Sequence, residues 1–167
     1  MCNIAQITNV LQSLLITDGP KGKRCVRTTT YHAFQLFKEH RGNTAVHVEN
    51  DSNDPPGVSI SVTKAQGKLV VSLVNPRDSE EVSAECALRG VTALKASARI
   101  LHNADRNAAN TFDAPDAIVP KTMPVRIEDG KLLVDLAPLS AVTVVVDCHG
   151  RGPRFEGAAD RAANLAG

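Results

Sequence analysis

Apolar and polar residues alternate most regularly over residues 58–75, and this stretch predicts a β-hairpin. Residues 58–63 read VSISVT, which is the two-residue period of a strand with one buried and one solvent-facing side. Gly67 interrupts the pattern and can adopt a positive φ, so a short loop is expected there. Residues 69–74 read LVVSLV and are apolar on both faces, which predicts a strand in the middle of a sheet.

Further alternating runs predict that most of the later chain is β-structure. They lie at residues 82–88, 94–100, 132–136 and 141–147, with turn residues between them. About seven strands at this spacing indicate an antiparallel β-sandwich over residues 44–148. A long irregular connection is expected from His102 to Pro124. Residues 149–167 are rich in Gly, Ala and Arg, and we expect them to form a disordered tail.

The segment 4–16 is apolar but leaves the choice between helix and strand open. Apolar residues recur at helical spacing from Ile4 to Leu14, yet the start of the segment also alternates like a strand. Either element should be buried, and it would carry the side-chain amides of Gln6 and Asn9. A buried amide without partners costs about 1–3 kcal/mol, so both amides should be hydrogen bonded.

A helix rich in aromatic residues is predicted from Tyr31 to His40. Residues 28–30 are three threonines that can cap its start, and the Arg-Gly-Asn sequence at 41–43 ends it. The basic stretch before it, residues 17–27, predicts a solvated loop. About 40 residues are too few to build a core of their own. The first 43 residues therefore look like the end of a larger domain.

Charge and cysteine content narrow the classes of partner. The 167 residues carry a net charge of +1 without a basic run, so we expect neither nucleic acid nor a membrane surface as a partner. No run approaches the roughly 20 apolar residues of a membrane helix, and the start lacks the features of a signal peptide.

The four cysteines are too far apart for a paired zinc motif, and the histidines add no metal-binding spacing. Separate buried thiols in a reducing, cytoplasmic compartment, without metal or cofactor, are expected. The cysteines are Cys2, Cys25, Cys86 and Cys148.

Two isolated features could be interpreted as catalytic, but each has a simpler explanation. Glu80 and Glu81 could form an acid/base couple, yet adjacent strand residues point to opposite faces, so a solvated turn is favoured. His32 could act as a base or a metal ligand. Because no second candidate lies near it in the sequence, a surface or helix-cap position is favoured.

The stretch NAANTFDAPDAIVP, residues 107–120, has two interpretations. The side chains of Asn110, Asp113 and Asp116 could bind calcium through oxygen, but their spacing departs from an EF-hand loop. The alternative is a long connection held by Asx turns, with Phe112 inserted into the core. We favour this second, structural interpretation.

Three separated motifs carry a family resemblance. In chain order they are MCNIAQITNVLQSLLITDG, TTTYHAFQLFKEH and NAANTFDAPDAIVP. Together they resemble the C-terminal third of the α-L-arabinofuranosidases of glycoside hydrolase family 51. The resemblance implies a (β/α)8 barrel followed by a β-sandwich of jelly-roll type. It makes residues 1–43 the barrel's C-terminal remnant, with Cys2–Gln6 as the eighth strand and Tyr31–His40 as the eighth helix, and it makes residues 44–148 the sandwich.

The resemblance also implies an activity, the release of terminal α-L-arabinofuranosyl groups from arabinan, arabinoxylan and arabinosides with retention of configuration. Such chemistry needs two carboxyl groups about 5 Å apart. The resemblance places both glutamates on barrel strands upstream of Met1, which is then an internal methionine of a longer reading frame. We therefore expect no catalytic residue in this chain and no hydrolysis by the chain alone.

Gln6 is the residue that the resemblance assigns to substrate. It matches the glutamine of the family's N-I-A-Q motif, at the C-terminal end of the last barrel strand, where barrel active sites lie. The implied role is a hydrogen bond to a sugar hydroxyl. The alternative is an amide that only satisfies backbone groups at the barrel rim.

The implied partners are an arabinose-containing oligosaccharide or polysaccharide and, for the full-length enzyme, further copies of itself. Two other roles stay open at this point. One is a stand-alone β-sandwich module that binds carbohydrate, although only Phe112 and Phe155 lie beyond residue 43 to stack on sugar. The other is a purely structural or oligomerisation module.

Overall fold

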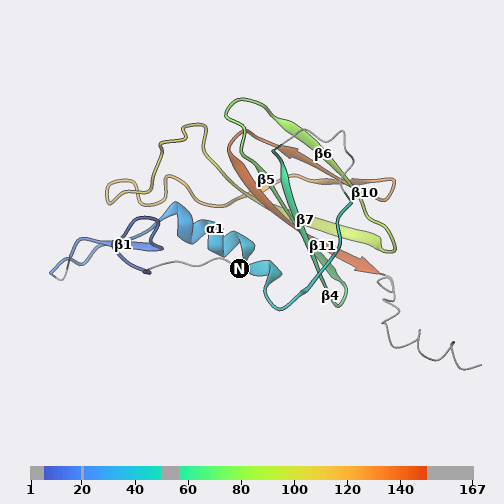
Figure 1. The fold of residues 1–167 in the computed structure, drawn as a ribbon, viewed down its shortest axis with the longest axis horizontal. Helices are drawn as coiled ribbons and strands as arrows, with labels where there is room; N and C mark the ends of the chain where they lie inside the picture. The colour runs from blue at the N-terminus through green and yellow to red at the C-terminus, as the bar shows by residue number, and fades with distance from the viewer. Residues whose placement is uncertain (1–5, 20, 50–56, 150–167) are drawn as a thin grey trace, which may run out of the picture.

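The computed structural model describes residues 6–19, 21–49 and 57–149. This part of the chain is mainly β, with one short helix (Figure 1). It begins with a small hairpin and a helix: β1 (Leu15–Thr17), β2 (Cys25–Arg27), α1 (Thr29–Phe37) and the 3-10 turn η1 (Lys38–His40). The remaining strands are β3 (Thr44–Ala45), β4 (Ser59–Ala65), β5 (Lys68–Asn75), β6 (Val82–Ala87), β7 (Thr92–His102), β8 (Lys121–Met123), β9 (Arg126–Glu128), β10 (Lys131–Leu136) and β11 (Ser140–His149).

Beyond the β1–β2 hairpin, the strands form two sheets that share one apolar core. A six-stranded sheet has the order β3-β4-β5-β11-β7-β8, and a three-stranded sheet has the order β6-β10-β9. All paired neighbours run antiparallel. The buried core is built largely from alternate residues of the central strands: Leu69, Val71, Leu73, Leu132, Val134, Leu136, Val142, Val144 and Val146. The predicted mainly β, antiparallel structure is therefore confirmed.

The predicted hairpin is present and lies where its pattern indicated. Strands β4 and β5 pair antiparallel up to Ala65 and Lys68, and the two residues between them include Gly67 at a φ of +71°. The position favours glycine because a side chain is disfavoured in this left-handed conformation. Strand β5 lies between β4 and β11 and is buried on both faces, as its apolar sequence predicted.

Helix α1 and η1 lie on the outer face of the six-stranded sheet, which is the face away from the core that it shares with the three-stranded sheet. Leu36 of α1 packs with Leu101 and Ile118 in a second, smaller apolar cluster. The helix begins at Thr29, because the Thr28 hydroxyl accepts a hydrogen bond from the Tyr31 backbone N–H at 3.2 Å. The predicted aromatic helix is thus confirmed, with its last turn wound as a 3-10 helix.

Two predictions for the N-terminal part are wrong in this structure. Most of the described part of segment 4–16 is not buried: residues 6–12 are exposed and form no helix, and Ser13 is the one buried residue among 6–16. The expected solvated loop, residues 17–27, instead contains strand β2, whose Val26 is buried. The hairpin forms because β2 pairs with β1, a partner that the basic composition of this stretch did not indicate.

The cysteines differ in environment more than predicted. Cys25 is exposed, Cys86 is half-buried and Cys148 is buried, and these three described thiols form no disulfide. Burial raises the pKa of the Cys148 thiol, and the neighbouring Asp147 carboxylate adds to the effect. The prediction of buried thiols is therefore wrong for Cys25, which lies on the short strand β2. Cys2 lies outside the described residues.

The long connection between β7 and β8 is irregular up to Pro120, but residues 121–123 form the edge strand β8. Phe112 is only half-buried, so its predicted insertion into the core is wrong. Ile118 is the residue of this connection that is buried in the second cluster. Of the predicted tail, His149 is the last residue of β11, and residues 150–167 lie outside the described part.

We predict that Leu132→Ala will lower the free energy of unfolding by about 2–5 kcal/mol, because this fully buried leucine belongs to the core cluster to which both sheets contribute, and its removal leaves a cavity. Leu94→Ala is the control, since that side chain is 57% exposed and its loss should change stability by less than about 1 kcal/mol. Urea unfolding measures both. Equal losses would contradict the assignment of the core.

Candidate functional site

Gln6 lies at the start of the described chain, exposed and outside any helix or strand. The strand predicted at Cys2–Gln6 otherwise falls outside the described residues. The assignment of Gln6 to substrate accordingly stays a prediction.

The segment after Gln6 folds into a closed loop. The Ile7 carbonyl accepts hydrogen bonds from the backbone N–H groups of Leu14 and Leu15, at 2.9 and 3.0 Å. The Asn9 amide donates to the Thr17 hydroxyl at 2.8 Å and accepts from the Thr17 N–H at 2.7 Å. The amide of Asn9 is hydrogen bonded as expected, although it is exposed rather than buried. It holds the loop closed and is not directed toward a ligand.

Exposed apolar side chains are concentrated in this part of the chain. Leu11 is 96% exposed and Ile7 is 62% exposed. Among the large apolar residues that are exposed in the described structure, only Leu94 lies outside the first 34 residues. The others, called here the N-terminal apolar group, are Ile7, Val10, Leu11, Ile16 and Phe34. Large exposed apolar patches are typical of interaction surfaces, so this group is a candidate for one.

Asn110 joins the long connection to the N-terminal hairpin. Its side chain is buried; the amide donates to the Arg27 carbonyl at 2.9 Å and to the Ile118 carbonyl at 3.0 Å, and it accepts from the Ile118 N–H at 2.7 Å. These bonds use both amide hydrogens and the oxygen, so Asn110 serves the structure rather than a cation. In the described ranges no cluster of His, Cys, Asp and Glu could hold a metal ion.

Asx turns support the rest of this connection. The side-chain oxygen of Asn103 accepts from the Asp105 N–H, and that of Asp105 accepts from the Asn107 N–H, each at 2.9 Å. These two Asx turns precede the stretch 107–120; within it the Thr111 hydroxyl accepts from the Ala114 N–H at 3.1 Å, and Asx turns there stay a prediction. Phe112 lies beneath the Arg24 guanidinium, which is 4.6 Å from the ring centre.

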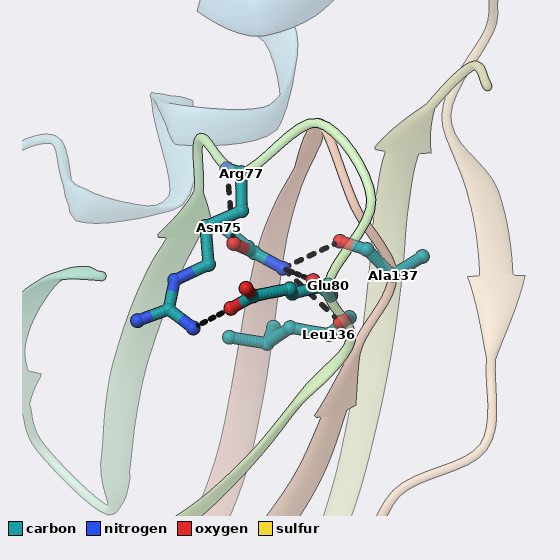
Figure 2. Close-up of polar contacts among 5 residues, drawn as sticks. All are labelled: Asn75, Arg77, Glu80, Leu136 and Ala137. Atoms are coloured by element: carbon teal, nitrogen blue, oxygen red, sulfur yellow. Dashed lines mark hydrogen bonds and ion pairs between the residues drawn. The ribbon is translucent and has the colours of Figure 1, made fainter. Parts of the chain in front are cut away.

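Asn75 forms a second buried anchor, at the end of β5 (Figure 2). Its amide donates to the carbonyls of Glu80, Leu136 and Ala137 at 2.8, 3.3 and 3.1 Å, and it accepts from the Arg77 N–H at 3.2 Å. The turn between β5 and β6 is thereby fixed to the connection between β10 and β11. The Glu80 carboxylate is exposed and paired with Arg77, which confirms the solvated turn.

A cleft of about 430 Å³ adjoins Asn75 at this end of the six-stranded sheet. Its floor includes the apolar residues Leu101 and Ile118, and its rim carries polar side chains of the long connection, among them Asp105 and Arg106. Arg106 forms an ion pair with Asp78 at 3.1 Å, so its charge is already partnered. The cleft is a junction of turns with an apolar floor, and Asp105, the acid on its rim, is exposed to solvent.

A histidine and a serine come together where η1 meets the sheet. His40 Nε2 lies 2.7 Å from the Ser72 hydroxyl, and His40 Nδ1 lies 2.8 Å from the Thr63 hydroxyl. Ser72 in turn lies 2.6 Å from the Thr143 hydroxyl. A serine beside a histidine can be an activated nucleophile. Ser72 is only 1% exposed, however, so a substrate cannot reach it, and the contacts form a structural network.

His32 is buried, which contradicts its predicted surface or cap position. It lies one helical turn before Leu36 and therefore shares the face of α1 that packs inward. Its Nδ1 lies 3.4 Å from the Gln35 side-chain oxygen, and its Nε2 has no hydrogen-bond partner among the described residues.

Comparison with known proteins identifies the family. The model of the α-L-arabinofuranosidase C-terminal domain matches residues 1–140. The chain belongs to this family. An intracellular exo-α-L-arabinofuranosidase of Bacteroides ovatus is 32% identical to this C-terminal domain over 154 residues, covering 86% of the chain and 29% of the relative.

Solved structures agree with the family. The family 51 arabinofuranosidase of Xanthomonas axonopodis pv. citri is 28% identical with a TM-score of 0.77, over 88% of this chain and 31% of that protein. The arabinose complex of the Thermotoga maritima enzyme shares the fold, with 21% identity and a TM-score of 0.68, over 86% of this chain and 33% of that protein. The chain thus spans about a third of these relatives. The predicted resemblance to the C-terminal part of a family 51 enzyme is confirmed.

We predict that Asn110→Ala will lower the free energy of unfolding of the C-terminal domain by about 1–3 kcal/mol, because it leaves the Arg27 and Ile118 backbone groups unpaired. Asn107→Ala is the control in the same connection, because Asn107 is exposed and its backbone bond to Asp105 survives the substitution. Urea unfolding measures both changes. An Asn110 variant as stable as the Asn107 variant would show that the anchor is dispensable.

Proposed function

We propose that the chain supplies the C-terminal part of a retaining α-L-arabinofuranosidase of family 51. In this proposal residues 1–43 complete a (β/α)8 barrel and residues 44–148 form a jelly-roll sandwich. The observation that carries it is the family match over residues 1–140, combined with relatives of which this chain spans about a third.

The physical task of the β-structure in this proposal is support. Helix α1 is buried on one side against the six-stranded sheet, while the N-terminal apolar group remains exposed. A barrel packed over this group would remove its side chains from water, at about 25 cal/mol for each Å² covered. The sheet would then hold the last barrel helix in place from the opposite side.

Gln6 would be this chain's contribution to the active site. At the rim of the barrel its amide would donate or accept a hydrogen bond with a hydroxyl of the terminal arabinofuranosyl group. The nucleophile and the acid/base would both come from other barrel strands. The chain alone would then bind sugar weakly and cleave nothing.

The proposed substrates are arabinan, arabinoxylan and arabinosides, in an enzyme that acts in the cytoplasm and forms a homo-oligomer. The name of the Bacteroides ovatus relative, an intracellular exo-acting arabinofuranosidase, supports the location and the attack on terminal groups. No helix in the described ranges is long and apolar enough to cross a membrane.

The alternative of a stand-alone carbohydrate-binding module is less well supported. Such modules commonly use exposed aromatic rings to stack on sugar. Between residues 44 and 149 the sequence has a single Phe, Tyr or Trp residue, Phe112, and the Arg24 guanidinium lies over its ring. A structural role for the β-structure, by contrast, is part of the proposal itself.

We predict that the purified 167-residue chain releases no detectable arabinose from 4-nitrophenyl α-L-arabinofuranoside, because the two carboxyl groups that the reaction needs lie outside it. Release of nitrophenolate, followed by absorbance, measures this. Turnover that survives repeated purification would mean that acids within this chain carry the chemistry.

We also predict that Gln6→Ala will lower kcat/KM about tenfold in a chimaera in which this chain replaces the matching part of the Bacteroides ovatus relative. The loss corresponds to about 1.4 kcal/mol, the contribution of one hydrogen bond to substrate. Gln66→Ala, in the turn of the β4–β5 hairpin, is the matched control and should leave kcat/KM unchanged. If the two variants behave alike, Gln6 has only a structural role at the rim.

A further inference from the structure

The junction of η1 with the six-stranded sheet is polar within an otherwise apolar layer. Strands β5 and β11 present Ser72 and Thr143 to this junction, and the two residues pair directly in the sheet. The hydroxyl of Thr63 on β4 faces the same histidine. The His40 ring therefore bridges the helical segment to β4 and β5 directly, and to β11 through Ser72.

The hydrogen bonds favour the neutral form of this ring. Asn43 Nδ2 donates a hydrogen bond to the Thr63 hydroxyl at 3.2 Å. The Thr63 hydroxyl can then donate its own hydrogen bond to His40 Nδ1. His40 Nε2–H then donates to Ser72, and Ser72 donates to Thr143. A neutral imidazole has one donor and one acceptor and satisfies this chain of bonds completely. A second ring proton on Nδ1 would need the Thr63 hydroxyl as an acceptor, and the Thr63 hydroxyl proton would then lose Nδ1 as its own acceptor.

The surroundings of the ring also disfavour a positive charge. Burial lowers the pKa of His40 below its ordinary value, and the Glu39 carboxylate offsets this only in part. Glu39 is exposed and lies 4.0 Å from the Lys38 ammonium group. The Phe37 ring stacks on the imidazole, with centres 6.3 Å apart.

Other charges around the junction give a protonated ring little support. They are Lys38, Glu39 and Arg41 beside it in sequence, Lys64 next to Thr63 on β4, Arg99 paired with Thr143 on β7, and the Lys68–Asp147 pair farther along β5 and β11. The nearest cross-strand partner of Thr143 on β7 is thus an arginine. Asp147 lies four residues beyond Thr143, which is about 13 Å along the strand.

We propose that His40 is a proton-sensitive clasp that holds the helical segment 29–40 on the outer face of the six-stranded sheet at neutral pH and loosens when its ring is protonated. In the unfolded chain the ring titrates near its ordinary pKa, about 6.5. Because the folded state binds this proton less readily, the clasp contributes fully above that value. Its contribution is lost as the pH falls below it.

The first test compares urea unfolding of the wild-type chain, His40→Gln and His47→Gln at pH 7.5 and 5.5. Glutamine keeps a donor and an acceptor but does not titrate, and His47 is exposed in the segment after β3. We expect the unfolding equilibrium constant of the wild type and of His47→Gln to rise about threefold more on acidification than that of His40→Gln. Parallel responses of all three proteins would overturn the proposal.

The second test needs no variant and decides the matter if His40→Gln fails to fold. Amide hydrogen exchange of the wild-type chain is measured at the two pH values and corrected for intrinsic exchange rates. Protection of the α1 amides should fall about threefold or more at pH 5.5, and protection of the β10 amides should fall no further than the change in the global unfolding constant. Unchanged protection of α1 would show that His40 is not a clasp.

Discussion

Two strands of this protein must be covered on both faces, and the rest of the fold follows from that constraint. Strands β5 and β11 pair along their length at the centre of the six-stranded sheet, and both carry apolar residues on each side. One face is covered by β10 and its neighbours, which form the three-stranded sheet. On the other face, Leu36 of α1 packs beside Leu101 of β7 and Ala141 of β11, and His40 of η1 contacts Ser72 of β5. A sheet with only its inner face buried would leave Val70 exposed to water, at a cost of about 1.5–3 kcal/mol for such a side chain.

Much of the β-structure could be predicted from the alternation of apolar and polar residues alone, because the predicted strands have one consistently apolar face. The hairpin around Gly67 and the double-sided character of β5 belong to this group. The small elements could not be predicted. Strand β8 has three residues and β3 has two, too few for any period to be recognised. Strand β2 exists because β1 pairs with it, and such pairing is not visible in a stretch of basic residues.

The polar anchors were harder to foresee because their partners lie far away in sequence. Asn110 bonds to Arg27 across 83 positions, and Asn75 bonds to Ala137 across 62. A sequence pattern marks Asn110 as a turn residue without indicating what it holds. His40 was noticed only as the end of a helix. The available signal of a buried partner was Ser72 and Thr143, each the one polar residue within the apolar runs 69–74 and 141–146. Gln6 was assigned from a family motif, since its local environment carries no chemical signature.

The position of β11 constrains how the chain can be assembled during synthesis. This strand is the last described element, yet it occupies the middle of the six-stranded sheet, between β5 and β7 (Figure 1). When the ribosome has made only the residues before Ser140, the two halves of that sheet lack the strand that joins them. Earlier strands must therefore wait, with apolar faces uncovered, until β11 has been synthesised. The closing pairs span long loops, which slows the search for them. In this fold β11 joins the two halves of the sheet, and the nascent protein is most exposed to misassociation just before this strand emerges.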